Sequence, residues 1–247
     1  GIATVLILPK EPSSAEQPNQ LFDRSQVLDQ LRPPAHAPEF SRVFAARTCM
    51  MAGVGLTGVF LWYLVRFWVY GKAVVLTSAP LTIPAGFLIA GMAVATLIGA
   101  ALASWAAGPF SERIEEKNIP VARVVAGACL LYAAGLALAW GLGVWSTGTA
   151  RENGMLLFAL ISGFAFGVYD SLGLELVMDS LPDPRRAGHD LGIYALANSA
   201  GLALAAIIGA LLVNAFEHSF GYYLLFPSAI VMVLLAGIVT LTTKSAE

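Results

Sequence analysis

The chain has 247 residues, of which 57% are hydrophobic and 12% are charged. Soluble domains have about 45–50% apolar and about 25% charged residues, so this composition excludes a soluble globular protein and indicates a chain that resides in the lipid bilayer. A formal net charge of −2 provides no basic surface for phosphate groups, which argues against nucleic acid as a partner.

The first 42 residues contain two different segments. Residues 1–8 are apolar and end before Pro9, without the basic start and small-residue cleavage site of a signal peptide. We interpret them as the tail of a truncated transmembrane helix, so that further sequence precedes them. Residues 9–42 are polar and carry six prolines, a composition that cannot form a packed core. They are predicted to be a cytoplasmic linker between domains.

Six long apolar runs follow, each close to the roughly 20 residues that an α-helix needs to cross about 30 Å of hydrocarbon. They are Val43 to Val65, Ile83 to Ala106, Val121 to Trp145, Met155 to Met178, Leu191 to Val213 and Tyr222 to Leu241. The predicted loops between them are polar or contain Gly and Pro, as expected where the backbone leaves the lipid. The predicted fold class is therefore all-α integral membrane, with six transmembrane helices in residues 43–242 and a cytoplasmic tail at 243–247.

The basic residues are distributed unevenly between the predicted loops. With the linker in the cytoplasm, 11 of the 14 Lys and Arg residues lie at the cytoplasmic side, and only Arg66, Lys72 and Arg151 lie outside. Short cytoplasmic loops are enriched in Lys and Arg. Both ends of the six-helix unit are therefore predicted to face the cytoplasm, in the plasma membrane of the cell.

An aromatic cluster marks the outer end of the first predicted span. It comprises Trp62, Tyr63, Phe67, Trp68 and Tyr70. Amphipathic rings favour the headgroup layer, so one interpretation is an interfacial anchor. A second interpretation is that Trp62 or Tyr63 stacks on a substrate such as a sugar ring.

Two charged residues lie inside predicted spans, where an isolated charge costs at least about 2.5 kcal/mol. Arg47 lies about one turn into the first span, where it either extends to the headgroups or faces the bundle to pair with an acid or bind substrate. Asp170 has a short side chain that cannot reach the interface, so it is predicted to face a cavity. Its reversible protonation would couple transport to a proton, whereas the alternative is a structural ion pair with Arg47 or with a part of the protein that precedes residue 1.

Two polar residues lie near these charges in the predicted topology. Glu175 is about one turn closer to the cytoplasm than Asp170, at a predicted inner vestibule. Asn198, within the fifth span, can hydrogen-bond either a substrate hydroxyl or a neighbouring helix. The candidate residues for binding a substrate or a coupling ion, either a proton or sodium, are Asp170, Arg47, Asn198, Glu175 and Tyr63.

Residues for enzymatic chemistry are missing from the predicted spans. His36, His189 and His218 all fall in predicted loops, so no intramembrane Ser and His pair can form. The sequence contains no paired-aspartate motif, no zinc-ligand spacing and no phosphate-binding glycine loop. We therefore predict no enzymatic activity, no metal site and no cofactor.

Two predicted cytoplasmic segments resemble a known family. Residues 108–114 read GPFSERI and resemble the G-x-L-[SA]-D-R-x-G-R-[RK] signature of the major facilitator superfamily, with Phe for Leu and Glu for Asp. The basic residues that end the signature are replaced by residues 115–117, EEK. Residues 163–200, GFAFGVYDSLGLELVMDSLPDPRRAGHDLGIYALANSA, look like the region around the tenth and eleventh helices of actinobacterial, sugar-transporter-like members.

The resemblance implies that residues 43–242 are the carboxy-terminal six-helix half of such a transporter, with an N-terminal half preceding the linker. It further implies a small-molecule substrate that binds near the midplane between two halves that alternate in access. The implied cytoplasmic gate consists of Gly108, Ser111, Glu112 and Arg113. An alternative from another class is a membrane receptor or assembly subunit that has six spans and does not transport.

Overall fold

The computed structural model describes residues 38–70, 82–117, 119–145, 148–181, 187–216 and 218–243, and within these ranges every regular element is a helix. The elements are α3 (Pro38–Gly58), α4 (Leu61–Tyr63), the π-helix η2 (Leu64–Val69), α5 (Thr82–Glu116), α6 (Val121–Trp145), α7 (Thr149–Asp179), α8 (Ala187–Ala215) and α9 (His218–Leu241). The predictions for residues 1–8 and for most of the linker lie outside the described residues.

The fold class is the predicted one. Five of the described helices are long and apolar enough to cross a membrane, and the bent pair Pro38–Gly58 and Leu61–Val69 makes a sixth when it is counted as one span. In hydrocarbon every backbone amide needs an internal partner, which an α-helix provides along its own length. This requirement explains why such long apolar runs all form helices.

All of the described long helices except α6 extend beyond the predicted span limits. Residues 38–42, which the composition assigned to the linker, belong to α3, because Pro38 lacks the N–H that the first helical residue leaves unpaired. Residues 108–116, predicted to be a loop, form the last turns of α5, where Glu and Arg are strong helix formers. His189 and His218 also lie in helices, α8 and α9, rather than in the predicted loops.

The first span is bent, which the apolar run did not predict. Its two parts, Pro38–Gly58 and Leu61–Val69, meet at an angle of 41°. The second part continues as the π-helix η2, in which the backbone N–H of Tyr70 reaches back to the carbonyl of Val65 at 3.3 Å. This end of the span therefore differs from a regular α-helix. Single-turn π-helical segments are frequent at functional sites.

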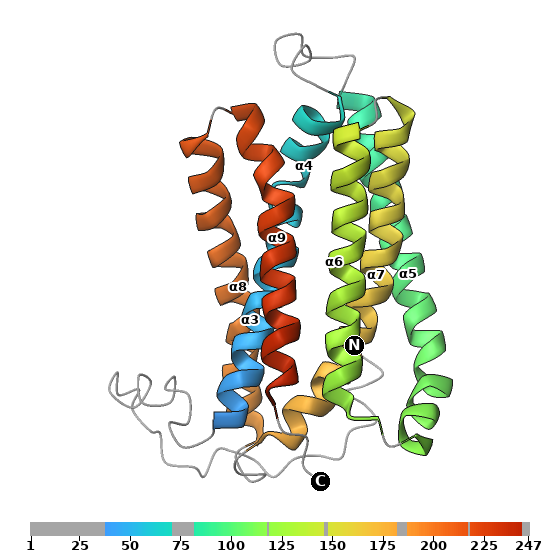
Figure 1. Cartoon of the computed structure of the whole chain (residues 1–247), viewed down its shortest axis with the longest axis vertical. Coiled ribbons are helices and arrows are strands. Elements are labelled where there is room, and N and C mark those ends of the chain that lie inside the picture. Colours follow the sequence, from blue (N-terminus) through green and yellow to red (C-terminus); the bar gives the residue numbers. More distant parts are fainter. Residues whose placement is uncertain are drawn as a thin grey trace, which may run out of the picture. The chain divides into compact units, whose positions relative to one another are not determined.

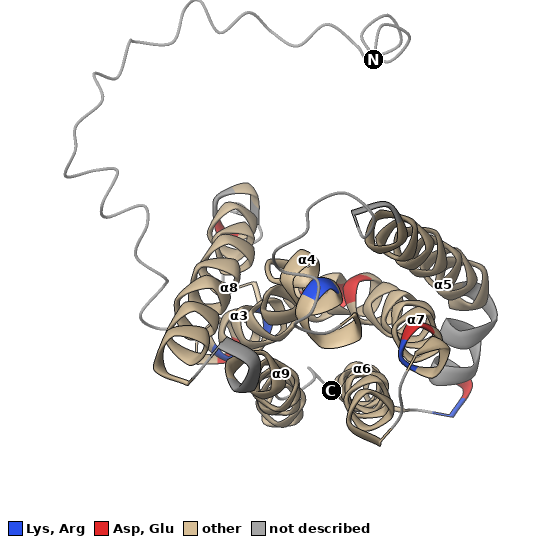
Figure 2. Ribbon diagram, turned by 90° about the horizontal axis from the view of Figure 1, so that it is seen from above, with Lys and Arg blue, Asp and Glu red and all other residues tan. Residues whose placement is uncertain are grey.

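The helices pack into two groups of three. One group consists of the first span, α8 and α9, and the other consists of α5, α6 and α7, as Figure 1 shows. Helices α6 and α9 lie side by side and join the two groups along one face, which is visible from above in Figure 2. Helices α5 and α8 lie at opposite flanks of the described bundle.

Small residues set the closest helix contacts. A Cβ atom added at Gly163 of α7 would lie 2.2 Å from the backbone oxygen of Thr96 on α5, and one added at Gly99 would lie 2.3 Å from the oxygen of Leu160. A Cβ at Gly201 of α8 would lie 2.6 Å from the oxygen of Thr48 on α3. Without side chains at these points the helix backbones touch, which is how membrane helices gain van der Waals contact.

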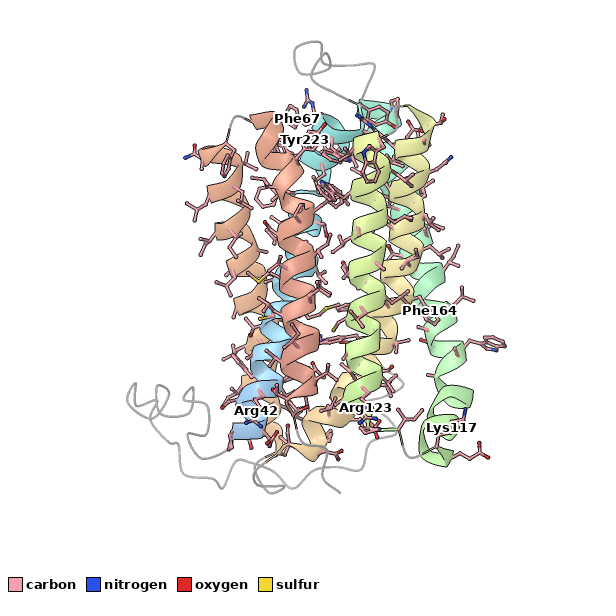
Figure 3. All side chains as sticks on the ribbon, in the orientation of Figure 1. Arg42, Phe67, Lys117, Arg123, Phe164 and Tyr223 are labelled. Carbon is pink, nitrogen blue, oxygen red and sulfur yellow. The ribbon has the colours of Figure 1, made fainter. Side chains whose placement is uncertain are left out.

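The two ends of the bundle differ in chemistry. Figure 3 places Phe67 and Tyr223 at one end and Arg42, Lys117 and Arg123 at the other. We call these the aromatic end and the basic end. Trp68 of η2 packs against Tyr223 and Phe226 of α9, with ring centroids 4.0 and 5.4 Å apart, so the aromatic end of the first span is fixed to α9.

Candidate functional site

Three helices place polar side chains at one depth in the bundle. Arg47 follows the start of α3 by nine residues, Asp170 precedes the end of α7 by nine, and Asn198 follows the start of α8 by eleven. At a rise of 1.5 Å per residue these positions lie about 13 to 17 Å from the basic end of their helices. Helices α7 and α8 have 31 and 29 residues, more than the roughly 20 that cross a core about 30 Å thick. Their basic ends therefore extend beyond the core, and the three side chains lie within the spans, in the half nearer the basic end.

The Arg47 guanidinium joins the other two side chains. Its Nη1 atom lies 2.8 Å from Oδ1 of Asp170, which forms an ion pair, and its Nε donates a hydrogen bond of 2.7 Å to Oδ1 of Asn198. The Arg47 side chain is 9% exposed. It therefore faces the bundle, which decides between the two orientations that the sequence left open.

Three aromatic rings surround the same guanidinium. The Cζ atom of Arg47 lies 5.7 Å from the ring centroid of Phe166, 5.6 Å from that of Tyr169 and 5.8 Å from that of Tyr194. A guanidinium within about 6 Å of a ring face is attracted by the ring quadrupole, and more strongly where water is excluded. The rings therefore stabilise the buried charge together with Asp170 and Asn198.

These three rings were not among the residues predicted from the sequence. Phe166 precedes Asp170 by four residues and Tyr194 precedes Asn198 by four, so each ring lies on the same helix face as its polar neighbour. The spacing of four residues could have indicated that each ring lies beside a polar member of the site. Aromatic residues are also common in apolar spans for packing alone, which is why the pattern did not stand out.

The Asp170 carboxylate is accessible, in contrast to its partner. Its side chain is 55% exposed. It follows Ile161 by nine residues, or two and a half helical turns, which puts it on the opposite side of α7. Ile161 packs against Gly135 of α6, so the carboxylate points away from α6. An ion pair with one buried and one open member can accept a ligand on the acid without exposing the base.

The ion pair connects the two helix groups. Arg47 belongs to the group of α3, α8 and α9, whereas Asp170 belongs to the group of α5, α6 and α7. At the aromatic end a second connection exists, where Nη1 of Arg151 donates a hydrogen bond of 3.0 Å to the backbone oxygen of Trp68. The start of α7 is thus tied to η2, and its middle is tied to α3.

Tyr70 and Glu152 strengthen the connection at the aromatic end. Burial first, and a hydrogen bond to the Glu152 carboxylate second, raise the pKa of Tyr70 to about 12. A raised phenol pKa keeps the proton in place below the unfolded value of about 10, and the associated stability is lost only as the pH rises toward 12. The Tyr70 hydroxyl therefore remains a donor across the physiological range.

We call Arg47, its polar partners Asp170 and Asn198, and the three surrounding rings the Arg47 cluster. Two predicted site residues lie apart from it. Tyr63 is 48% exposed at the aromatic end, where it stacks with Phe67 and Tyr222 at centroid distances of 6.4 Å each. Glu175 is exposed on α7. In the part of the chain that the structure describes it makes no hydrogen bond or ion pair. The structure thus brings Arg47, Asp170 and Asn198 together and leaves these two separate.

The four predicted gate residues share one helix end. Gly108, Ser111, Glu112 and Arg113 all lie in the last turns of α5, at the basic end of the bundle. Their side chains are outside the described residues. Elsewhere, no group of three or more His, Cys, Asp or Glu side chains that could hold a metal ion occurs among the described residues.

These features define the class of protein. A bundle of up to six apolar helices, with an accessible carboxylate paired to a buried guanidinium within the spans, is a multi-pass membrane protein with a polar site inside the membrane. The model of the Major Facilitator Superfamily matches residues 85–247. The chain belongs to this superfamily, whose members carry small solutes across membranes. No curated protein and no solved structure matches the chain.

Proposed function

We propose that this chain forms half of a secondary active transporter whose solute binds beside Arg47, Asp170 and Asn198. The observation that carries the proposal is the ion pair within the spans, with the Arg47 side chain 9% exposed and the Asp170 side chain 55% exposed. An open carboxylate in a membrane span is costly unless it lines a watery cavity. A solute site between two six-helix halves provides such a cavity.

The chemistry around the cluster favours a sugar-like or amphipathic drug-like solute. Asp170 offers accessible acceptor oxygens, while Phe166 and Tyr194 are only partly buried and lie next to it around the Arg47 guanidinium. Polar acceptors beside ring faces match molecules that combine hydroxyl or amine donors with an apolar surface. The resemblance of residues 163–200 to actinobacterial, sugar-transporter-like members supports the same substrate class.

We propose that Asp170 also binds the coupling ion, either a proton or sodium. Both ions would neutralise the carboxylate that holds Arg47, so binding would weaken the tie between α7 and α3. The solute and the ion would then share one residue. This sharing gives a direct physical link between ion binding and the change of access.

We propose that a second, N-terminal six-helix half covers the Arg47 cluster on the side where Asp170 is exposed. We also propose that the protein resides in the plasma membrane. The basic end carries Arg42, Lys117 and Arg123, which supports its placement in the cytoplasm. The gate residues Ser111, Glu112 and Arg113 would then close the cytoplasmic side.

The test begins with a substrate screen. The purified full-length protein is heated with a panel of sugars and of amphipathic drug-like compounds, and a compound that raises its melting temperature is taken as a ligand. Gradient-driven uptake of that compound is then measured in cells that express wild-type protein or Asp170→Asn. We expect Asp170→Asn to abolish uptake while its amount in the membrane is unchanged.

The matched control is Glu175→Gln on the same helix, which removes an exposed acid outside the cluster. We expect this variant to transport like the wild type. Uptake by Asp170→Asn at the wild-type rate would remove this carboxylate from the mechanism. Equal loss in both variants would show a general need for negative charge on α7 instead of a specific site.

A further inference from the structure

A groove lies between α5 and α6, on the side of α7 opposite Asp170, and is independent of the transport function. Its volume is about 360 Å³, within the range of ligand-binding pockets. Helix α7 forms its floor through Ala165 and Val168, while Ala103 of α5 and Gly127 of α6 line its walls. The groove is thus open to the surroundings of the bundle.

The helix packing explains why the groove exists. Helix α5 touches α7 backbone to backbone at Gly99 and Gly163, and α7 packs closely against both α5 and α6. Beyond that crossing the α5 wall consists of alanines, and the facing part of the α6 wall includes Gly127 and Ala128. These small side chains do not fill the space between the two helices. A Cβ at Gly127 would meet nothing within 4 Å, so the gap is real at this point.

The groove runs from one bilayer surface toward the midplane. Arg123 lines it near the start of α6, and Leu131 lines it eight residues further along the same helix. These positions are about 12 Å apart along the helix axis, close to the roughly 15 Å thickness of one hydrocarbon leaflet. An apolar space of this length in a membrane loses dispersion contacts unless an acyl chain enters it.

The mouth of the groove carries a positive charge. Arg123 is exposed and is the charged residue among the described residues that line the groove. In the described part of the chain its side chain has no ion pair or hydrogen bond. A guanidinium presents paired donors that match phosphate oxygens, and basic sites between membrane helices bind anionic headgroups. Figure 3 shows Arg123 at the basic end, with Phe164 deeper in the bundle.

We propose that this groove binds one anionic phospholipid, with an acyl chain between α5 and α6 and its phosphate on Arg123. The positive charge at the mouth selects an anionic lipid over a zwitterionic one, and the apolar walls accept the acyl chain. A free phosphate ion lacks the chain that fills the groove. The bound lipid would support the contact between α5 and α6, which do not pack tightly against each other.

The test measures lipid retention by the full-length protein in detergent. The delipidated protein is titrated with phosphatidylglycerol or with phosphatidylcholine of the same acyl chains, and bound lipid is counted by native mass spectrometry. We expect one tightly retained phosphatidylglycerol, which inorganic phosphate does not displace. Arg123→Gln should lower its affinity about fivefold, the effect of one basic residue at an anionic surface.

Two further variants separate the groove from general effects. Gly127→Leu should fill the groove and lower retention of both lipids, since its side chain enters open space. Lys117→Gln removes an exposed cation at the same end that does not line the groove, and it should bind as the wild type does. Equal retention of both lipids by the wild type, unchanged binding by Arg123→Gln, or equal losses in Arg123→Gln and Lys117→Gln would overturn the proposal.

Discussion

Arg47 keeps its charge inside the membrane through an unusually complete set of partners. Asp170 supplies the opposite charge at 2.8 Å, Asn198 accepts from Nε at 2.7 Å, and three rings lie within 5.8 Å of Cζ. The guanidinium is planar, so its separate N–H groups can reach both acceptors while its face lies near the rings. An ammonium group offers no such combination of directions.

This geometry predicts the effect of Arg47→Lys. The substitution retains the charge but loses either the Asp170 or the Asn198 contact, each a hydrogen bond to a charged group worth about 1.5–3 kcal/mol. We expect a lower melting temperature for the detergent-solubilised protein. Arg42→Lys on the same helix is the control, because the Arg42 side chain is 41% exposed and its contacts, with Glu39 and with the backbone oxygen of Thr242, lie near the surface. Equal melting temperatures for the two variants would contradict the prediction.

The sequence predicted the polar members of this cluster because each is expensive in hydrocarbon. A lone Arg or Asp in an apolar run demands a partner, and Arg47 and Asp170 were the clearest such residues. Their pairing was one of several alternatives, since nothing in the sequence relates depth on α3 to depth on α7. Tyr169 was not predicted, because a buried Tyr in a span is equally consistent with packing.

At the scale of the helices, the crossing of α5 and α7 depends on the absence of side chains. A Cβ at Gly163 would lie 2.2 Å from the Thr96 oxygen and 2.8 Å from the Thr96 Cα. Both are backbone atoms, so the helices must separate to admit a methyl group. Because α7 also carries Asp170, a shift of α7 would change the ion pair as well.

Gly163→Ala should therefore destabilise the protein by about 1–3 kcal/mol, the usual cost of overpacking. Gly173→Ala on the same helix is the control, because a Cβ there meets nothing within 4 Å and alanine has the higher helix propensity by about 1 kcal/mol. Thermal melting of the detergent-solubilised variants should place Gly163→Ala below the wild type and Gly173→Ala at or above it. The reverse order would be inconsistent with a close backbone crossing.

The ends of a helix could be predicted from the sequence only where the apolar run has clear limits. The third span, Val121 to Trp145, agrees with α6 at both ends. Pro120 precedes this span and the polar residues 146–148 follow it, so both limits are clear in the sequence. The bend at Gly58 to Leu61 was not predicted, because apolar composition continues through it unchanged. The helical end of α5 was also missed, since Gly108 and Pro109 ordinarily mark a loop.

At the scale of the whole molecule, the distribution of charge predicts which side faces the cytoplasm. Lys117 is exposed after α5 at the basic end, and Asn153 is exposed in the first turns of α7 at the aromatic end. In a Cys49→Ala, Cys129→Ala background, Asn153→Cys should react with an impermeant maleimide in intact cells. Lys117→Cys should react only after permeabilisation, and the opposite pattern would reverse the proposed orientation.

The arrangement of helices within the bundle could not be predicted from the sequence. Residues that face lipid and residues that face a neighbouring helix are both apolar in a membrane protein, so hydrophobic periodicity carries little information on packing. Leu130 of α6 is 61% exposed, whereas Leu136 of the same helix is fully buried. Nothing in the residue type distinguishes these two positions.

The two connections between α7 and the first span have a mechanical consequence. Arg151 holds α7 at the aromatic end through a backbone oxygen, a contact that does not depend on the charge of Asp170. Neutralising Asp170 would therefore release α7 from α3 only toward the basic end, while the aromatic end stays attached and α6 continues to pack against α9. The ion proposed to bind Asp170 would therefore separate the two helix groups at the basic end, while they stay joined at the aromatic end.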